Sequence, residues 1–275
     1  MVKPYTKRLI SLVEAELPGL IALRRELHQI PETAWQEEKT SARLQKQLEK
    51  IGAEQRRIAG TGILGQLKSG TGRVLALRSD IDALPIEELT DLPFKSRHPG
   101  RMHACGHDVH MSIIIGCATV LAQLRDEFQG TVKFFFQPAE EAPPGGAEAL
   151  IKAGVMAKPK VEMVFGLHVN PEIPTGKIGL RDGPLMAGVL DFDIRIIGDG
   201  GHAALPHRAH DPIVCAASLV EALQTIVSRN LDPFEPAVVS IGKIEGGTAR
   251  NIVPPECRLE GTARALNKTT LNLLR

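Results

Sequence analysis

The stretch MHACGHDVHMSIIIGCATVLAQL, residues 102–124, predicts a strand-to-helix loop followed by a buried helix. Its first nine residues hold one Cys and three His beside an acid, and an apolar run follows them. Thiolate and imidazole bind zinc, nickel, cobalt and iron well, so this clustering indicates a transition-metal site. Cys105 and His107, at i and i+2, project to one side of extended backbone and are the candidate ligands. The roles of His103 and His110 stay open, since His110 falls within the predicted helix and either fills space or orients a neighbour.

A second cluster follows an apolar strand pattern in TVKFFFQPAEE, residues 131–141. The β-branched and aromatic run predicts a buried strand that ends just before the adjacent acids Glu140 and Glu141. Consecutive side chains on extended backbone point in opposite directions, so the two carboxylates cannot easily serve one atom. One is expected to bind a metal while the other faces the substrate as a general base. A pair of solvated surface glutamates is the alternative.

Two further strand patterns end in ligand-type side chains. VEMVFGLHV, residues 161–169, ends near His168, and VLALRSDIDALPIEE, residues 74–88, leads into Asp80 and Asp82. Asp82 is suited to fix a ligand histidine by accepting its second N–H. A single strand His is more often structural, and His168 gains weight only as one of several such strand ends. Open α/β sheets place their ligand sites at strand ends, so these segments are expected to meet.

The pattern restarts beyond His168. GKIGLRDGPLMAG, residues 176–188, carries turn signals and is expected to be a linker. Three strands are predicted after it, at 189–198, 237–247 and 257–265. DPIVCAASLVEALQTIVSR, residues 211–229, predicts an amphipathic helix with Asp211 as N-cap and Pro212 at the first helical position. This half of the chain therefore predicts a smaller sheet covered by helices on one face.

Taken in order, the motifs resemble those of a known family. LHQIPETAWQEEKTS (27–41), LRSDIDALPIEE (77–88), MHACGHDVH (102–110), FFFQPAEEAPPGGAEALI (134–151), GLHV (166–169) and GDGGHAALPHRAHDPI (198–213) follow those of the M20 metallopeptidases. They are most similar to the amidohydrolase branch, from about residue 20 to the end. The resemblance implies an α/β fold, with a mixed-sheet di-metal catalytic domain at 1–184 and an inserted, smaller α+β dimerisation domain at 185–275.

The resemblance also implies roles for particular residues. The implied metal ligands are Cys105, His107, Glu141 and His168. The implied catalytic residues are Glu140, as general acid/base, and Asp82, which supports the metal centre. The implied substrate-binding residues are His202, acting across a dimer interface, and Asn251.

The function implied is hydrolysis of the amide bond of N-acyl amino acids by metal-activated water. The cofactor implied is a pair of divalent ions, zinc, manganese, nickel or cobalt, and the assembly implied is a homodimer through the smaller domain. Members of this branch carry a last metal-ligating His in a C-terminal segment. We therefore expect a truncated chain that stops inside the smaller domain, where ALNKTTLNLLR reads as the start of a helix.

Two other interpretations use the same residues. Cys105 could act as a nucleophile with a nearby His as its base, a reading that leaves the Glu140–Glu141 pair and His168 without a role. Alternatively, the chain is an inactive remnant that only dimerises or binds a ligand. Chelation separates the first alternative from a metal enzyme, and bound metal per chain separates the second.

Composition agrees with an ordinary globular protein, at 43% hydrophobic and 24% charged residues. A net charge of +1 predicts no nucleic-acid partner. No run approaches the roughly 20 apolar residues that span a bilayer, and the N-terminal stretch is unlike a signal, so a cytoplasmic protein without membrane contact is expected. The scattered cysteines predict no disulfides. Cys117 and Cys215 fall within predicted helices and are expected to pack in the protein core.

Overall fold

The computed structural model describes residues 4–275 and divides the chain into two compact units, one up to Glu172 and one from Ile173. This division lies between β5 (Met163–Gly166) and β6 (Gly188–Ile197), in a stretch without helix or strand. The boundary expected from the sequence, at 184/185, falls in the same stretch.

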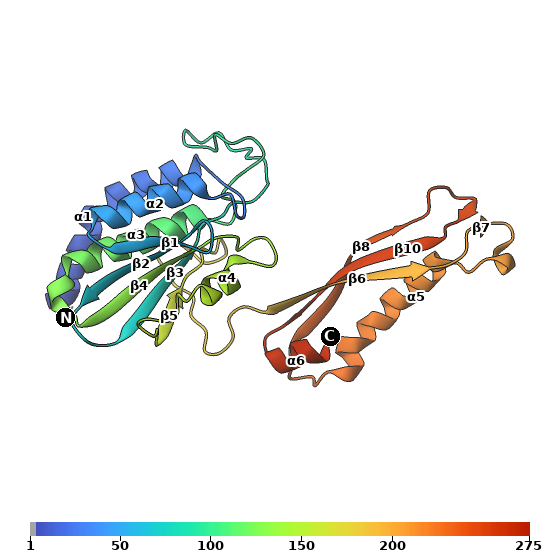
Figure 1. The fold of residues 1–275 in the computed structure, drawn as a ribbon. Helices are drawn as coiled ribbons and strands as arrows, with labels where there is room; N and C mark the ends of the chain where they lie inside the picture. The colour runs from blue at the N-terminus through green and yellow to red at the C-terminus, as the bar shows by residue number, and fades with distance from the viewer. Residues whose placement is uncertain (1–3) are drawn as a thin grey trace. The chain divides into compact units, whose positions relative to one another are not determined.

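The first unit is a mixed five-stranded sheet with helices packed on it (Figure 1). The strand order is β1-β2-β4-β3-β5, in which β3 runs parallel to β4 and β5 while β2 is antiparallel to β1 and β4. Besides β5, its elements are α1 (Pro4–His28), α2 (Glu38–Lys50), β1 (Glu54–Ile58), β2 (Gly62–Ser69), β3 (Val74–Asp80), α3 (His107–Gln123), the 3₁₀ turn η1 (Arg125–Glu127), β4 (Gly130–Gln137) and α4 (Gly146–Lys152).

Strand β4 shows why both faces of this sheet are covered. Successive strand side chains point to opposite faces. Phe134 and Phe136 pack with leucines and isoleucines of α1, α2 and α3, whereas Phe135 packs on the other face with Leu150 of α4. The continuous apolar run of β4 therefore belongs to a strand buried on both sides.

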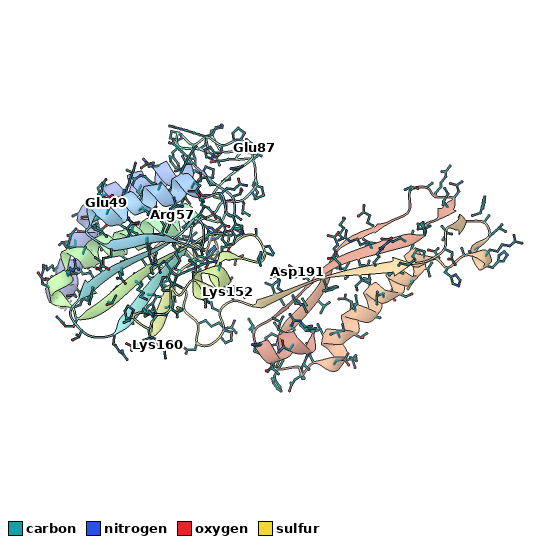
Figure 2. The ribbon with its side chains drawn as sticks, in the orientation of Figure 1. Glu49, Arg57, Glu87, Lys152, Lys160 and Asp191 are labelled. Carbon is teal, nitrogen blue, oxygen red and sulfur yellow. The ribbon has the colours of Figure 1, made fainter. Side chains whose placement is uncertain are left out.

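Polar contacts fix α2 to the sheet edge. Arg57 of β1 donates from Nε to Oε1 of Gln45 at 2.8 Å and from Nη2 to the carbonyl of Glu38 at 3.1 Å (Figure 2). Both acceptors lie on α2, so one guanidinium orients that helix over the edge strand.

The parallel strands β3, β4 and β5 end at the same edge of the sheet. Just past these ends, Ile81 N–H donates to the carbonyl of Gln137 at 3.0 Å. Helix α3 begins at this edge, after a long loop whose base is closed by reciprocal backbone hydrogen bonds between Leu84 and Met102, both 3.0 Å. Residues that follow β3, β4 and β5 and those that open α3 are thereby brought together.

Strand β5 is shorter than its sequence pattern and is exposed. The apolar pattern over 161–169 predicts a strand, of which Met163–Gly166 is extended, and every residue of β5 is exposed. The exposure of β5 follows from its position, because β5 is the edge strand of the sheet and pairs with β3 alone among the described strands.

The second unit is a three-stranded antiparallel sheet of order β6-β10-β8, with α5 packed against it (Figure 1). A small two-stranded ribbon joins β7 and β9. Besides β6, its elements are β7 (Gly201–His202), the 3₁₀ turn η2 (Pro206–Arg208), α5 (Pro212–Thr225), the π-helical turn η3 (Ile226–Asn230), β8 (Ala237–Gly246), β9 (Ile252–Val253), β10 (Glu256–Ala265) and α6 (Lys268–Leu273).

Helix α5 begins as the sequence predicts. The Asp211 carboxylate accepts hydrogen bonds from the backbone N–H groups of Ile213, at 2.8 Å, and Val214, at 3.4 Å, and Pro212 occupies the first position. Its only buried residues are Pro212 and Ala216. Cys215 is exposed, so its expected role as a core filler is wrong; Cys117 is half-buried, and all the cysteines are free.

By length and composition alone, one helix in the described part of the chain could cross a membrane, α5 with its continuation to Asn230. It packs on β10 through Ala216, Leu219 and Val220, beside Leu259. An amphipathic helix lying on a sheet accounts for the same composition.

Candidate metal centre

The candidate ligands meet at the edge where β3, β4 and β5 end. Ligand atoms of Cys105, His107 and His168 lie within 4.8 Å of one another, and so do those of His107, Glu140 and Glu141. His107 belongs to both groups. The structure thus brings together all the residues that the sequence proposes as metal ligands. Glu140, the expected acid/base, lies beside them.

His107 presents one ring nitrogen to this cluster. Its Nδ1 donates to the carbonyl of Asp82 at 2.8 Å and lies 3.4 Å from Oδ1 of the same residue. Its Nε2 is buried without a hydrogen-bond partner among the described residues, 3.9 Å from Glu140 Oε2 and 3.7 Å from Glu141 Oε1. A neutral ring that donates from Nδ1 keeps its lone pair on Nε2, which is the form that binds a metal.

Cys105 and His168 form the second side of the cluster. The Cys105 Sγ lies 3.3 Å from His168 Nε2, and His168 Nδ1 donates to the carbonyl of Val169 at 2.7 Å. His168 therefore turns the same nitrogen towards the cluster as His107 does. Burial, reinforced by a hydrogen bond to Glu141 and by its charge, raises the pKa of the Cys105 thiol to about 12. A bound cation would favour the charged forms of these crowded acidic groups and would deprotonate the thiol.

The backbone on either side of Glu140 is held by buried carboxylates. Glu37 Oε1 accepts from Ala139 N–H at 2.9 Å, and Asp82 Oδ2 accepts from Glu141 N–H at 2.9 Å. Ala139 has a φ of 47°, a left-handed conformation that a side chain rarely adopts. The two acceptors thus hold an unfavourable turn that sets Glu140 and Glu141 beside His107.

Glu140 and Glu141 differ in exposure. The Glu140 side chain is 40% exposed, whereas that of Glu141 is 21% exposed and its Oε1 is buried without a partner among the described residues. Burial, followed by the charge of Glu141, raises the pKa of Glu140. Glu141 is therefore the more inward candidate ligand, and Glu140 is the more open group.

Gly106 allows the loop to reach α3. It is the N-cap residue of α3 and adopts a left-handed conformation with a φ of 80°. A Cβ at this position would collide with Cγ2 of Val169, which follows the candidate ligand His168. Only glycine suits both the turn and the close packing.

A divalent cation fits these residues. Three inward polar atoms, His107 Nε2, Glu141 Oε1 and Asp82 Oδ1, are buried with no hydrogen-bond partner among the residues described. Each such atom costs about 1–3 kcal/mol if left unsatisfied, and a cation would satisfy them or their neighbours. Thiol, imidazole and carboxylate together suit zinc, cobalt, nickel or manganese.

A buried network behind the centre was not foreseen from the sequence. His28 contacts Asp108 Oδ2 through Nδ1 at 2.8 Å and Glu88 Oε1 through Nε2 at 3.3 Å, and Arg24 Nε lies 2.8 Å from the same Asp108 oxygen. The hydrogen bond to Asp108 raises the pKa of His28. Asp108 lies in the first turn of α3, and its partner on α1 is 80 residues away, a distance that periodicity cannot reveal.

His103 is also buried, at 4% exposed, and neither ring nitrogen has a partner within the described chain. Burial lowers the pKa of His103 to about 4. His103 does not join the groups of side chains that could hold a metal.

The proposed substrate-binding residues lie together in the second unit. His202 is on β7, opposite Ile252 of β9, and Asn251 precedes β9. The Asn251 carbonyl accepts from Ala203 N–H at 3.1 Å, and His202 Nδ1 accepts from Ala204 N–H at 3.1 Å. A ring that accepts at Nδ1 carries its hydrogen on Nε2, from which it can donate to a substrate oxygen.

Residues 76–254 match the model of peptidase family M20/M25/M40. This chain belongs to that family. It is 45% identical to the N-acyl-L-amino acid amidohydrolase of Geobacillus stearothermophilus, over 98% of this chain and 72% of that protein. It is also 45% identical to the N-acetylcysteine deacetylase of Bacillus subtilis, over 90% of this chain and 66% of that protein.

A solved structure of the M20 family has the same fold. It is a Bacillus subtilis protein described as a dinuclear metal binding peptidase, 40% identical, with a TM-score of 0.77 over 94% of this chain and 67% of that one. The family resemblance and the mixed α/β fold inferred from the sequence are confirmed.

Proposed function

We propose that this chain carries the centre of a metal-dependent amidohydrolase that cleaves the amide bond of N-acyl amino acids. The observation that carries the proposal is the convergence of Cys105, His107, His168 and Glu141, with Glu140 beside them. The substrate class is supported by the names of the two relatives, and a pair of metal ions by the dinuclear M20 structure.

In this proposal Cys105, His107, Glu141 and His168 hold the metals. The bound pair supplies a water of lowered pKa and polarises the scissile carbonyl. Asp82 keeps His107 in the required tautomer and fixes the backbone of Glu141. The choice among zinc, manganese, nickel and cobalt is left to experiment.

Glu140 is the proton carrier. Its raised pKa suits a group that accepts and returns a proton near neutral pH. It takes a proton from the attacking water and returns it to the departing amine, so that water and amide become carboxylic acid and amine. Its partial exposure leaves room for a substrate on the open side.

The second unit contributes substrate contacts and an interface in the same proposal. His202 acts across the interface of the proposed homodimer and donates from Nε2 to the substrate carbonyl, where charge develops during attack, and Asn251 contacts the substrate. A homodimer through this unit is supported by apolar exposure on α5, with Ile213 at 43% and Val214 at 63% exposed. Val214→Glu should lower the mass measured by light scattering to that of a monomer.

Metal removal tests the activity. We expect purified protein to hydrolyse N-acetyl and N-benzoyl amino acids, to lose that activity with EDTA, and to regain it with zinc, manganese, nickel or cobalt. The contact between Cys105 and His168 is also the one observation that favours a cysteine nucleophile. Activity that survives EDTA but not a thiol alkylating agent would establish that alternative, and protein that holds no metal in metal-replete medium would indicate an inactive remnant.

A further inference from the structure

His110 lies between two segments that carry candidate ligands. It is fully buried on α3, with its ring centroid 5.4 Å from that of His107 and 4.6 Å from that of His168. Its Nδ1 lies 2.7 Å from Asp80 Oδ1, and its Nε2 lies 3.0 Å from the backbone nitrogen of Val169. Both ring nitrogens are therefore occupied by protein groups.

The partners fix the tautomer of His110. A backbone N–H only donates, so Nε2 must accept from Val169 and the ring hydrogen resides on Nδ1, facing Asp80. Although Asp80, His107 and His110 are close enough to hold a metal, this tautomer leaves His110 no free lone pair for one. A role as a further ligand is thereby excluded for the arrangement observed.

Asp80 is itself anchored across the strand ends. Its Oδ2 accepts from Arg78 Nη1 at 2.7 Å, and Arg78 also donates to Gln137 Oε1 from Nε at 2.9 Å and from Nη2 at 2.8 Å. The anchoring group of His110 is thus tied to the ends of both β3 and β4. A ring held in this way is a rigid point of attachment for whatever its other nitrogen binds.

That attachment leads directly to a ligand. The Val169 N–H is held by His110, and the carbonyl of the same Val169 accepts from His168 Nδ1 at 2.7 Å. His168 is exposed and lies beyond the end of edge strand β5. The position of Val169 therefore sets the orientation of the His168 ring.

We propose that His110 is a positioning residue, which fixes the metal ligand His168 by holding the backbone N–H of Val169. The proposal rests on the function proposed above, because it takes His168 as a ligand. It assigns the buried histidine of the HDVH segment to the geometry of the metal site, without contact to the metal or the substrate. Loss of such a supporting contact typically lowers metal affinity about 10-fold to 100-fold.

Two substitutions of similar size separate the two contacts of His110. In His110→Gln the amide oxygen reaches the position of Nε2 and can accept from Val169, but the bond to Asp80 is lost. In His110→Asn the shorter amide reaches the position of Nδ1 and can donate to Asp80, but Val169 is left without its acceptor. Ser112→Ala is the matched control on the same helix, since Ser112 bonds only to the Asp108 carbonyl of its own helix.

Zinc affinity is measured on the full chain by competition with a chromophoric chelator. We expect His110→Asn to bind zinc about 10-fold to 100-fold more weakly than wild type, with His110→Gln and Ser112→Ala closer to wild type. In a His168→Ala background, His110→Asn should cause no further loss. Equal affinities in the Asn and Gln variants, or an undiminished effect of Asn without His168, would overturn the positioning role.

The wild-type protein provides a test that needs no variant. Hydrogen exchange should show the Val169 amide protected in the metal-free chain, and rapid exchange there would overturn the proposal. If wild type binds no zinc, the proposed function fails and the positioning role fails with it. If wild type binds zinc and the variants do not differ, only the positioning role fails.

Discussion

The carboxylate of Glu37 accepts a hydrogen bond from the backbone N–H of Ala139, with Oε1 and N 2.9 Å apart, although the two residues are 102 positions apart in the sequence. Thr61 Oγ1 donates to the other oxygen at 2.5 Å. Glu37 is fully buried, and its hydrogen bond from Ala139 holds the residue before the proposed proton carrier. The orientation of Glu140 therefore depends on a residue that touches neither metal nor substrate.

Glu37→Ala should leave the buried N–H of Ala139 without an acceptor, at a cost of about 1–3 kcal/mol in the free energy of unfolding. Because the turn before Glu140 is then released, kcat should fall more than KM rises. Glu37→Gln keeps an acceptor oxygen and should restore most of the kcat. The measurements are urea denaturation and steady-state hydrolysis of an N-acetyl amino acid.

Glu32→Ala is the control for that experiment. Glu32 is also buried, and its carboxylate accepts from Thr40 N–H at 2.9 Å and Lys39 N–H at 3.2 Å at the start of α2, without a hydrogen bond to the Ala139–Glu141 turn among the described contacts. Its loss should lower stability and spare kcat. Equal losses of kcat in the Glu32 and Glu37 variants would show that both act through stability alone.

Substitutions of the adjacent acids Glu140 and Glu141 should have different effects on activity and on bound metal. Glu140→Gln removes the proposed proton carrier, so kcat should fall roughly 100-fold to 10,000-fold while bound metal is retained. Glu141→Gln removes a proposed metal ligand, so bound metal should fall along with activity. Metal analysis of the two purified variants beside their kinetics checks this, and loss of metal from the Glu140 variant alone would reverse the assignment.

The buried His28 predicts a pH-dependent contribution to stability. Its pKa is raised above the ordinary value of 6.5, chiefly by the hydrogen bond to Asp108, with Glu88 adding to the effect and Arg24 opposing it. The protonated ring is therefore favoured by folding. Its contribution is complete below pH 6.5 and is lost as pH rises through the raised pKa.

His28→Gln, neutral at every pH, provides the comparison. Urea denaturation of metal-free protein should show the largest difference in free energy of unfolding between wild type and variant near pH 6, and a smaller one near pH 9. A difference that grows with pH would mean that His28 is neutral in the folded chain.

The exposed edge strand β5 predicts association in concentrated solution. Met163, Val164 and Phe165 are 50%, 43% and 48% exposed, and unpaired edge strands template pairing with other chains. Val164→Lys should slow the growth of light scattering at high protein concentration, with little effect on the unfolding transition. Ala42→Lys, on the exposed face of α2, adds the same charge elsewhere, and an equal benefit from it would attribute the effect to net charge.

The strand ends and their side chains could be predicted from the sequence, because apolar patterning and ligand chemistry are both local signals. The run ending at Gln137 marks a strand buried on both faces, and the Cys105–His107 spacing marks a ligand pair. The N-cap at Asp211 could also be predicted from the sequence, since Asp followed by Pro starts many helices.

Contacts across the fold were not predictable in the same way. Glu37 reads as an acid near the start of a helix, and nothing local shows that its acceptor faces Ala139. His110 read as a space filler or an orienting group, a choice that only its contacts with Asp80 and Val169 resolve. The exposure of β5 depends on which strands flank it, whereas its composition is that of a buried strand.

Gly106 has a practical consequence for redesign of this protein. Because its left-handed turn and its packing against Val169 leave no room for a side chain, variation at 106 would shift the neighbouring loops together. A directed-evolution library that aims at a different metal preference should therefore hold position 106 constant. Substitutions should be placed at more exposed positions around the candidate metal centre, where a change can alter selectivity without moving the loops that carry it.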